Sequence, residues 1–264
     1  MGVIPLSFLD LLAAGCLVAG LALVSIRMRL GLGRSILTAA LRTTVQLLLV
    51  GLVLKAIFSY VHPLLLLAMA LVMLGVATRE VMQRQHRRFT GWWGFGSGAA
   101  SMLLSSFSVA ILALVVMVGV EPWYAPQYAI PLLGMLLGNT MNGVALGLDR
   151  LTATAWREAR VIEARLLLGH TWPEAVRDIQ RESIRAGLIP VVNAMAVAGL
   201  VSLPGMMTGQ ILAGSPPLDA VKYQILIMFL ITTGTGFGTL AAVRLGARRL
   251  FDDRHRLRLD RLGS

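Results

Sequence analysis

The sequence predicts an all-α polytopic membrane protein with about seven transmembrane helices, and three observations lead to that class. Hydrophobic residues make up 56% of the 264 residues and the mean hydropathy is +0.75, far from the composition of a soluble domain. Apolar stretches recur at about the ~20 residues that a membrane-spanning helix needs. Basic residues gather on alternate connections between these stretches, which places them on one side of the membrane.

The expected spans form one transmembrane domain that covers residues 1–264. The first stretch lacks a basic n-region and a small-residue cleavage pattern, so we expect it to be kept as a span. The single cysteine, Cys16, lies within it, which excludes an internal disulfide and a thiolate metal cage. The seven spans are residues 4–26, 36–54, 62–78, 93–120, 124–148, 186–213 and 219–243.

The arginines predict the orientation. Three follow the first span, four follow the third, seven lie between residues 150 and 185, and seven lie in the C-terminal tail, about 244–264. The opposite side receives Lys55 and Lys222. The positive-inside rule therefore predicts an external N-terminus and a cytoplasmic C-terminus in a bacterial inner membrane. The net charge of +11 then reflects cationic loops beside an anionic leaflet of the lipid bilayer, so we expect no nucleic-acid partner.

The longest polar segment, about 150–185, is expected to form two short amphipathic helices joined at Gly169. Thr171 precedes Trp172, Pro173 and Glu174, a pattern typical of a helix start with Thr171 as the N-cap. Gly169 permits a sharp turn, including one with positive φ. A projecting helix pair of this kind can press into a groove on a partner and transmit its motion, although a solvated amphipathic helix is the alternative.

Part of this segment resembles the cytoplasmic loop signature of ABC importer permeases, Glu-Ala-Ala followed by Gly and Ile. The match is partial because the third position is Arg165 and no Leu-Pro follows the isoleucine. The chain has no Gly-x-x-x-x-Gly-Lys-Ser/Thr loop, so ATP and its Mg²⁺ would bind a partner subunit and this chain would bind no cofactor. The expected coupling residues are Glu163, Ala164, Gly169, Trp172 and Ile179.

A first set of polar residues, on the second span, is expected to line a translocation pathway. Arg42 lies one helical turn from Thr38 and from Gln46, so the three share a face. An arginine near mid-span costs roughly 2.5–3.5 kcal/mol unless it is paired or its head group reaches the interface. Arg42 therefore either faces a polar interior or snorkels to the cytoplasmic surface.

A second polar set lies on the fifth and sixth spans and contains amides without carboxylates: Asn139, Asn142, Asn193 and Gln210. Interhelical hydrogen bonding is the alternative to a conduit for these residues. The Pro204-Gly205 pair predicts a broken helix, because proline removes a backbone donor and frees carbonyls. Met206 and Met207 at this break are a candidate gate or substrate contact, and thioethers favour soft metals.

Several stretches resemble the Fet-type iron export permeases (FetB family) over nearly the whole chain. They are residues 134–141, 183–190, 199–209 with Leu-Pro-Gly-Met-Met, 220–225, and 42–51 with Lys55. The resemblance implies a permease that forms a homodimer, works with a separate ATP-binding cassette subunit and exports iron. It also leaves other cargo open, since plant relatives are linked to aluminium tolerance and sugar-nucleotide movement.

Two other classes of function are weighed against an ABC permease. An ion-coupled secondary transporter needs an ionisable group near the membrane midplane, and the acidic residues here are expected in loops or at span ends. A membrane-embedded enzyme needs a catalytic motif such as His-Glu-x-x-His, and none occurs. The four histidines have no ligand spacing, so the sequence predicts no catalytic residue and assigns no metal site.

Overall fold

The computed structural model describes residues 7–59 and 62–263. Helices dominate this part of the chain. Two short strands, β1 (Arg88–Phe89) and β2 (Leu262–Gly263), pair in antiparallel orientation. The all-α prediction is confirmed. Among the described residues, six helical segments are long and apolar enough to cross a membrane. They are α1 (Phe8–Arg27), α2 (Gly33–Ser59), α3 (Pro63–Gln83), the run from α4 to η2 (Trp92–Val118), α6 (Pro126–Arg157) and α11 (Pro217–Arg249).

The fourth of these segments is helical throughout but changes its winding. Two π-helical stretches interrupt it, and it ends where Gly119 takes a left-handed conformation with φ of 65°. Its pieces are α4 (Trp92–Met102), η1 (Leu103–Phe107), α5 (Ser108–Leu112) and η2 (Ala113–Val118). The remaining helices are α7 (Ala159–Leu167), α8 (Trp172–Ala175), α9 (Arg177–Val197), α10 (Gly205–Leu212) and the 3₁₀ turn η3 (Leu259–Arg261).

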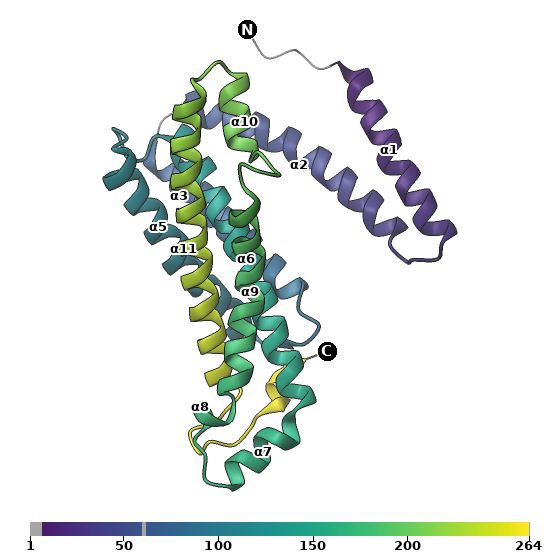
Figure 1. Ribbon diagram of the computed structural model, residues 1–264, viewed down its shortest axis with the longest axis vertical. Helices are drawn as coiled ribbons and strands as arrows, with labels where there is room; N and C mark the ends of the chain where they lie inside the picture. Colours follow the sequence, from purple (N-terminus) through teal and green to yellow (C-terminus); the bar gives the residue numbers. More distant parts are fainter. Residues whose placement is uncertain (1–6, 60–61, 264) are drawn as a thin grey trace.

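The expected sixth span, 186–213, is divided between α9 and α10. Residues 198–204 between them are irregular, so the predicted broken helix is confirmed, with the break beginning before Pro204. Gly199 has a φ of 84°, and its N–H donates to the carbonyl of Ser202. Among the described residues, six of the seven expected spans are continuous helical segments, and the expected sixth span is a divided path beside α11 (Figure 1), so the count of seven stays a prediction.

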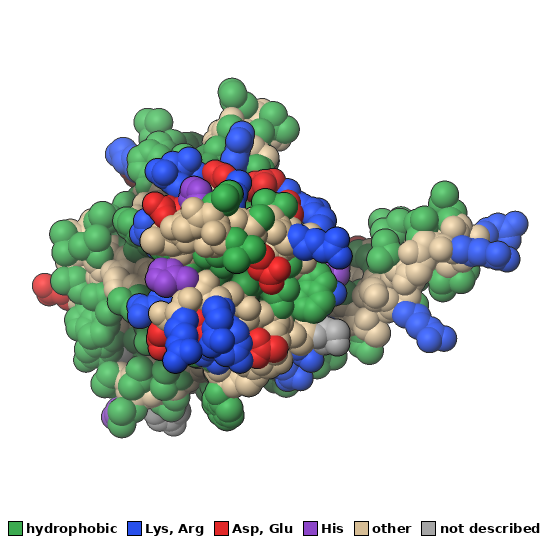
Figure 2. Space-filling model, turned by 90° about the horizontal axis from the view of Figure 1, so that it is seen from below, with side chains coloured by type: hydrophobic (Ala, Val, Ile, Leu, Met, Phe, Trp, Pro, Cys, Tyr) green, Lys and Arg blue, Asp and Glu red, His purple; other side chains and the backbone are tan. Residues whose placement is uncertain are grey.

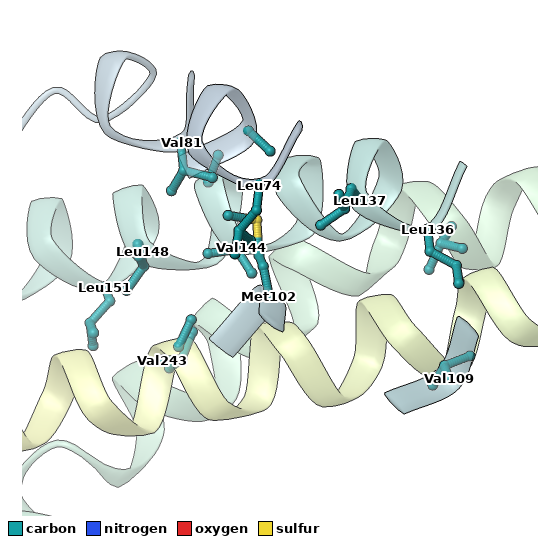
Figure 3. Packing of buried hydrophobic residues seen from close by; sticks show 14 of the residues in the cluster. Leu74, Val81, Met102, Val109, Leu136, Leu137, Val144, Leu148, Leu151 and Val243 are labelled. Atoms are coloured by element: carbon teal, nitrogen blue, oxygen red, sulfur yellow. The ribbon is translucent and has the colours of Figure 1, made fainter. Parts of the chain in front are cut away.

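Helix α6 lies at the centre of the bundle and packs against α3, α9 and α11 (Figure 1). Leu136, Val144 and Leu151 on α6 are almost fully buried, and they meet Met102 and Val243 from neighbouring helices (Figure 3). In a lipid environment such helices associate through close packing, since lipid tails are as apolar as leucine. The helix contacts must therefore be tight.

Small residues allow the backbones of α6, α9 and α11 to approach closely. A Cβ atom placed on Gly187 would lie 2.5 Å from the carbonyl oxygen of Gly143, and one on Gly147 would lie 3.0 Å from Val243 Cγ2. A Cβ on Gly143 would lie 2.6 Å from Thr235 Cγ2. Gly143 and Gly147, four residues apart on α6, thus serve close helix packing.

The α1–α2 hairpin projects from the side of the bundle (Figure 1). The two helices pack mainly on each other, and none of the apolar window of α2 is buried within the described chain. This hairpin is consequently the part of the fold with the largest uncovered helical surface.

We predict that Gly187→Ala lowers the midpoint of thermal unfolding in detergent, because the new methyl group forces α9 away from the α6 backbone. Overpacking of this kind costs about 1–3 kcal/mol. Gly138→Ala is the matched control, since a Cβ at that position meets nothing within 4 Å. Equal midpoints for the two variants would show that the α6–α9 contact does not require glycine.

Candidate functional site

The hairpin between α6 and α9 is the first candidate site. Gly169 turns the chain after α7 with a φ of 90°, as the sequence predicted. Thr171 caps α8: its N–H and hydroxyl donate to Glu174 Oε2 at 2.8 and 2.7 Å, which lowers the pKa of the Glu174 carboxyl. Helix α8 has only four residues, so the expected pair of short helices is one two-turn helix and one single turn.

The tip of this hairpin exposes two leucines. Leu167 and Leu168 are 89% and 80% exposed, directly before Gly169. Glu163 and Ala164 are also exposed on α7. Because this tip extends past the ends of α6 and α11 (Figure 1), the exposed leucines form an apolar ridge beyond the apolar spans.

Two of the expected coupling residues lie elsewhere in the hairpin. Ile179 is buried in the core at the start of α9, and Trp172 is half-buried with its ring stacked on Phe251 at 5.7 Å. Leu167 and Leu168 are not among the expected coupling residues, although their position beside Gly169 was the available signal. The assignment of all five residues to coupling stays a prediction.

Contacts on both sides hold the hairpin rigidly. Arg165, which departs from the importer signature, donates to the Ala175 carbonyl at 3.0 Å and lies 3.3 Å from the Asp178 carboxylate. The Trp172 N–H donates to His255 Nδ1 at 3.0 Å. The C-terminal segment therefore braces the hairpin, where the sequence suggested only a basic tail.

The tail is folded rather than extended. Arg244, Arg248 and Arg249 belong to α11, and Arg261 donates to the carbonyls of Arg249 and Phe251 at 2.8 and 3.0 Å. Nearby, the hydrogen-bonded Arg258 side chain lowers the pKa of Asp260 to about 2. The tail thus carries its own ion pairs and encloses Phe251, the partner of Trp172.

A cavity at the helix break is the second candidate site. It has a volume of about 500 Å³ and lies between α9, the break, α10 and α11. Met195, Met207 and Met228 line it, together with Pro204 and Gln224. Gln224 is 7% exposed, and its Oε1 has no hydrogen-bond partner in the described chain. The lining of the cavity therefore contains three methionines and one amide side chain, without a carboxylate.

The structure separates the two methionines that the sequence placed together. Met207 lines the large cavity, whereas Met206 lines a small neighbouring cavity of about 80 Å³ with Met135. Gly205 begins α10, and the Gln210 Oε1 is buried without a hydrogen-bond partner in the part described. Met195 and Met228 were missed because only the fold brings α9 and α11 to the break.

The polar residues of the second and fifth spans meet through a charge network. Arg42 lies 3.6 Å from Glu80 on α3, and Arg84 lies 3.4 Å from the same carboxylate while donating to Asn142 Oδ1. The Arg42 side chain is 55% exposed. Glu80 was missed as its partner, since sequence spacing does not show which helices are neighbours.

The other predicted pathway residues do not join that network. Asn139 donates to the Met135 carbonyl of its own helix at 2.8 Å. Gln46 is exposed on α2, and Asn193 is exposed on α9. The two predicted polar sets are therefore rearranged: Asn142 lies with Arg84, and neither Asn142 nor Gln210 lines the helix-break cavity.

These features define a polytopic membrane protein with a projecting, braced hairpin. The chain belongs to the family described as "Uncharacterised protein family (UPF0014)", whose model matches residues 8–251. It is 42% identical over 231 residues to "UPF0014 membrane protein slr1647" of Synechocystis, covering 86% of this chain and 87% of the relative. No solved structure gives a significant match.

Two further relatives carry functional names. The chain is 34% identical over 242 residues to the "Probable iron export permease protein FetB" of Escherichia coli, covering 89% of this chain and 88% of the relative. It is 31% identical over 217 residues to "Protein ALUMINUM SENSITIVE 3" of Arabidopsis thaliana, covering 82% and 77% respectively. The resemblance to the FetB family is confirmed.

Proposed function

We propose that this chain is the permease subunit of an ATP-binding cassette transporter that exports iron or a related metal ion. ATP would be hydrolysed by a separate subunit, in the inner membrane of a bacterium. The observation that carries the proposal is the braced hairpin, whose exposed apolar tip extends past the ends of α6 and α11 (Figure 1). The similarity to a relative named as a probable iron export permease supports the cargo.

Helix directions support seven crossings with the hairpin in the cytoplasm. Gly143 and Gly147 on α6 lie beside Thr235 and Val243 on α11 in the same order, so α6 and α11 run parallel. The chain between them must return, and α9 with α10 makes that return (Figure 1). Counting this divided path as a crossing places the basic connections on one side, as the positive-inside rule requires.

The hairpin can transmit motion because it is tied to three helices. Arg165 binds it to the start of α9, and the stack of Trp172 on Phe251 binds it to the end of α11. α7 continues from α6 after a break at Glu158. If a partner subunit binds Leu167 and Leu168, its motion is therefore transmitted to the helices that border the helix-break cavity.

The cavity supports a weakly bound cargo rather than a tight cage. Within residues 7–59 and 62–263, no group of three or more His, Cys, Asp or Glu side chains is placed to hold a metal ion. The thioethers of Met195, Met207 and Met228 at the break give exchangeable ligands, which suits transport because a cargo must also leave. No residue that lines the cavity is cationic, which disfavours a sugar nucleotide with its phosphates.

The volume of the helix-break cavity favours, as the second candidate, a cargo larger than a bare metal ion. About 500 Å³ is far larger than a bare ion and falls within the range of small-molecule sites. A metal complex, or a neutral organic cargo moved by the same ATP-driven permease, would fill it. An ion-coupled transporter gains no support, because Glu80 lies near the end of α3 in an ion pair with Arg42.

The uncovered α2 helix supports a homodimer. Gln46 lies near the middle of this helix and is exposed, and an amide that faces hydrocarbon is costly. A second copy of the chain that packs on the Gln46 face would supply hydrogen-bonding groups. Two copies also provide the two coupling hairpins expected of a complete transporter.

We predict that Leu167→Ser with Leu168→Ser lowers affinity for the ATP-binding subunit by at least about 100-fold, because each leucine contributes about 1.5–3 kcal/mol when buried. The measurement is co-purification and permease-stimulated ATPase activity. Val161→Ser is the control, as Val161 is 51% exposed on α7 away from the tip. Full stimulation by the double variant would remove the hairpin from the docking role.

We predict that cells without the gene accumulate iron, measured beside manganese, copper and aluminium, and that the wild-type gene reverses this. Replacing Met195, Met207 and Met228 with leucine should lower efflux roughly tenfold, the effect of about 1.4 kcal/mol lost from cargo contact. Met117→Leu is the control, since Met117 is exposed on η2. Accumulation of none of the four metals would turn the proposal toward organic cargo.

We predict that Gln46→Cys, in a Cys16→Ala background, cross-links two copies of the chain in membranes with a short thiol reagent. Leu52→Cys, at an exposed α2 position on another face, should give little cross-linked product. The readout is the dimer band after denaturing electrophoresis. Dimer at Leu52 but not at Gln46 would place the interface on a different face of α2.

A further inference from the structure

A basic hollow lies where α8, α9 and α11 meet, apart from the hairpin tip and the helix-break cavity. It has a volume of about 600 Å³. Basic side chains gather on this end of the molecule (Figure 2). The hollow is lined by Trp172, Pro173, Glu174, Arg177, Gln180, Arg244, Leu245 and Arg248.

The three arginines of the hollow outnumber its one carboxylate, Glu174, which acts electrostatically on Arg177. Arg177, Arg244 and Arg248 are exposed, and none of them forms an ion pair within the described residues, in contrast to Arg150 with Glu182 or Arg165 with Asp178. The carboxylate of the hollow, Glu174, already accepts both hydrogen bonds from Thr171. The hollow therefore contains three arginine side chains and one carboxylate, which already accepts hydrogen bonds from Thr171.

The depth of the hollow matches the level of lipid headgroups. Arg244 directly follows the apolar stretch 219–243 of α11, and Arg248 lies one turn further on the same face. Trp172 adds a half-buried indole, the side chain enriched at membrane interfaces. A phosphate at this level would meet several guanidinium groups, which bind phosphate oxygens well.

An apolar seam continues from the hollow toward the membrane interior. Helices α9 and α11 pack side by side, and Leu188 Cδ2 lies 3.9 Å from a Cβ placed on Gly236. Phe237, two turns before Arg244, is 63% exposed on the same face of α11. Cationic groups at one end and an exposed apolar strip at the other match the two ends of a phospholipid.

We propose that this hollow binds the phosphate headgroup of an anionic phospholipid, whose acyl chain lies along the α9–α11 seam. A partner protein is the weaker occupant, because Trp172 is held against Phe251 and the apolar ridge that suits protein docking is at Leu167 and Leu168. Such a lipid would bridge α8 to α11, so it would stiffen the joint between the hairpin and the helix bundle.

The test compares the full-length protein in nanodiscs of phosphatidylcholine with and without phosphatidylglycerol. Native mass spectrometry after detergent release measures which lipid stays bound. We expect preferential retention of phosphatidylglycerol, with a loss of roughly fivefold in the preference for each arginine replaced by glutamine. The variant Arg177→Gln, Arg244→Gln, Arg248→Gln should therefore retain both lipids equally.

The matched control removes three other exposed arginines: Arg27→Gln, Arg34→Gln, Arg160→Gln. It carries the same net charge as the first variant and should keep the preference. Equal loss in both variants would overturn the proposal in favour of general leaflet electrostatics. If the triple variant does not fold, the variant Arg248→Gln alone gives the same comparison. An unchanged preference for phosphatidylglycerol in whichever of these variants folds would refute the site.

Two further experiments distinguish a bound lipid from other ligands of the hollow. Inorganic phosphate or glycerol phosphate that displaces the retained lipid at millimolar concentration would identify a soluble anion site and overturn the lipid assignment. Loss of the ATP-binding subunit from the triple variant in pure phosphatidylcholine would identify a protein docking surface and also overturn it. Because lipid retention is measured without the ATP-binding subunit, its failure leaves the proposed transport function intact.

Discussion

The close approach of α6, α9 and α11 is the contact on which the rest of the molecule depends. In lipid, apolar side chains gain little from leaving the solvent, so helices associate where backbones can come near each other. Gly143, Gly147 and Gly187 provide that approach, and Thr235 and Thr239 fill the remaining space. This packing fixes the directions of the three helices and therefore places both the break in the return path and the hairpin below it.

The break between α9 and α10 shows how an apolar path tolerates irregular backbone. The carbonyl of Val197 accepts bonds from the N–H groups of Val201 and Ser202, and Gly199 donates to Ser202. These local bonds satisfy part of the backbone that the helix no longer pairs. The wall of α11 behind the break contributes Gln224 and Met228 to the lining of the cavity.

The hairpin and the C-terminal segment act as one unit at the opposite end of this path. Phe251 stacks on Trp172, and the Trp172 backbone N–H donates a hydrogen bond to His255. The Arg261 side chain donates a hydrogen bond to the Phe251 carbonyl. These contacts fix the hairpin against the end of α11 and leave Leu167 and Leu168 exposed at its tip.

The sequence by itself determined the helical class, the approximate positions of six spans, the Thr171 cap, the Gly169 turn and the break near Pro204, because each follows from periodicity or from the chemistry of a few adjacent residues. Only the tertiary structure decided that Arg42 pairs with Glu80, that Met206 and Met207 face different cavities, and that the tail braces Trp172. Those pairings join residues far apart in the chain, and helix neighbours in a membrane are chosen by packing shape, which local sequence patterns do not encode.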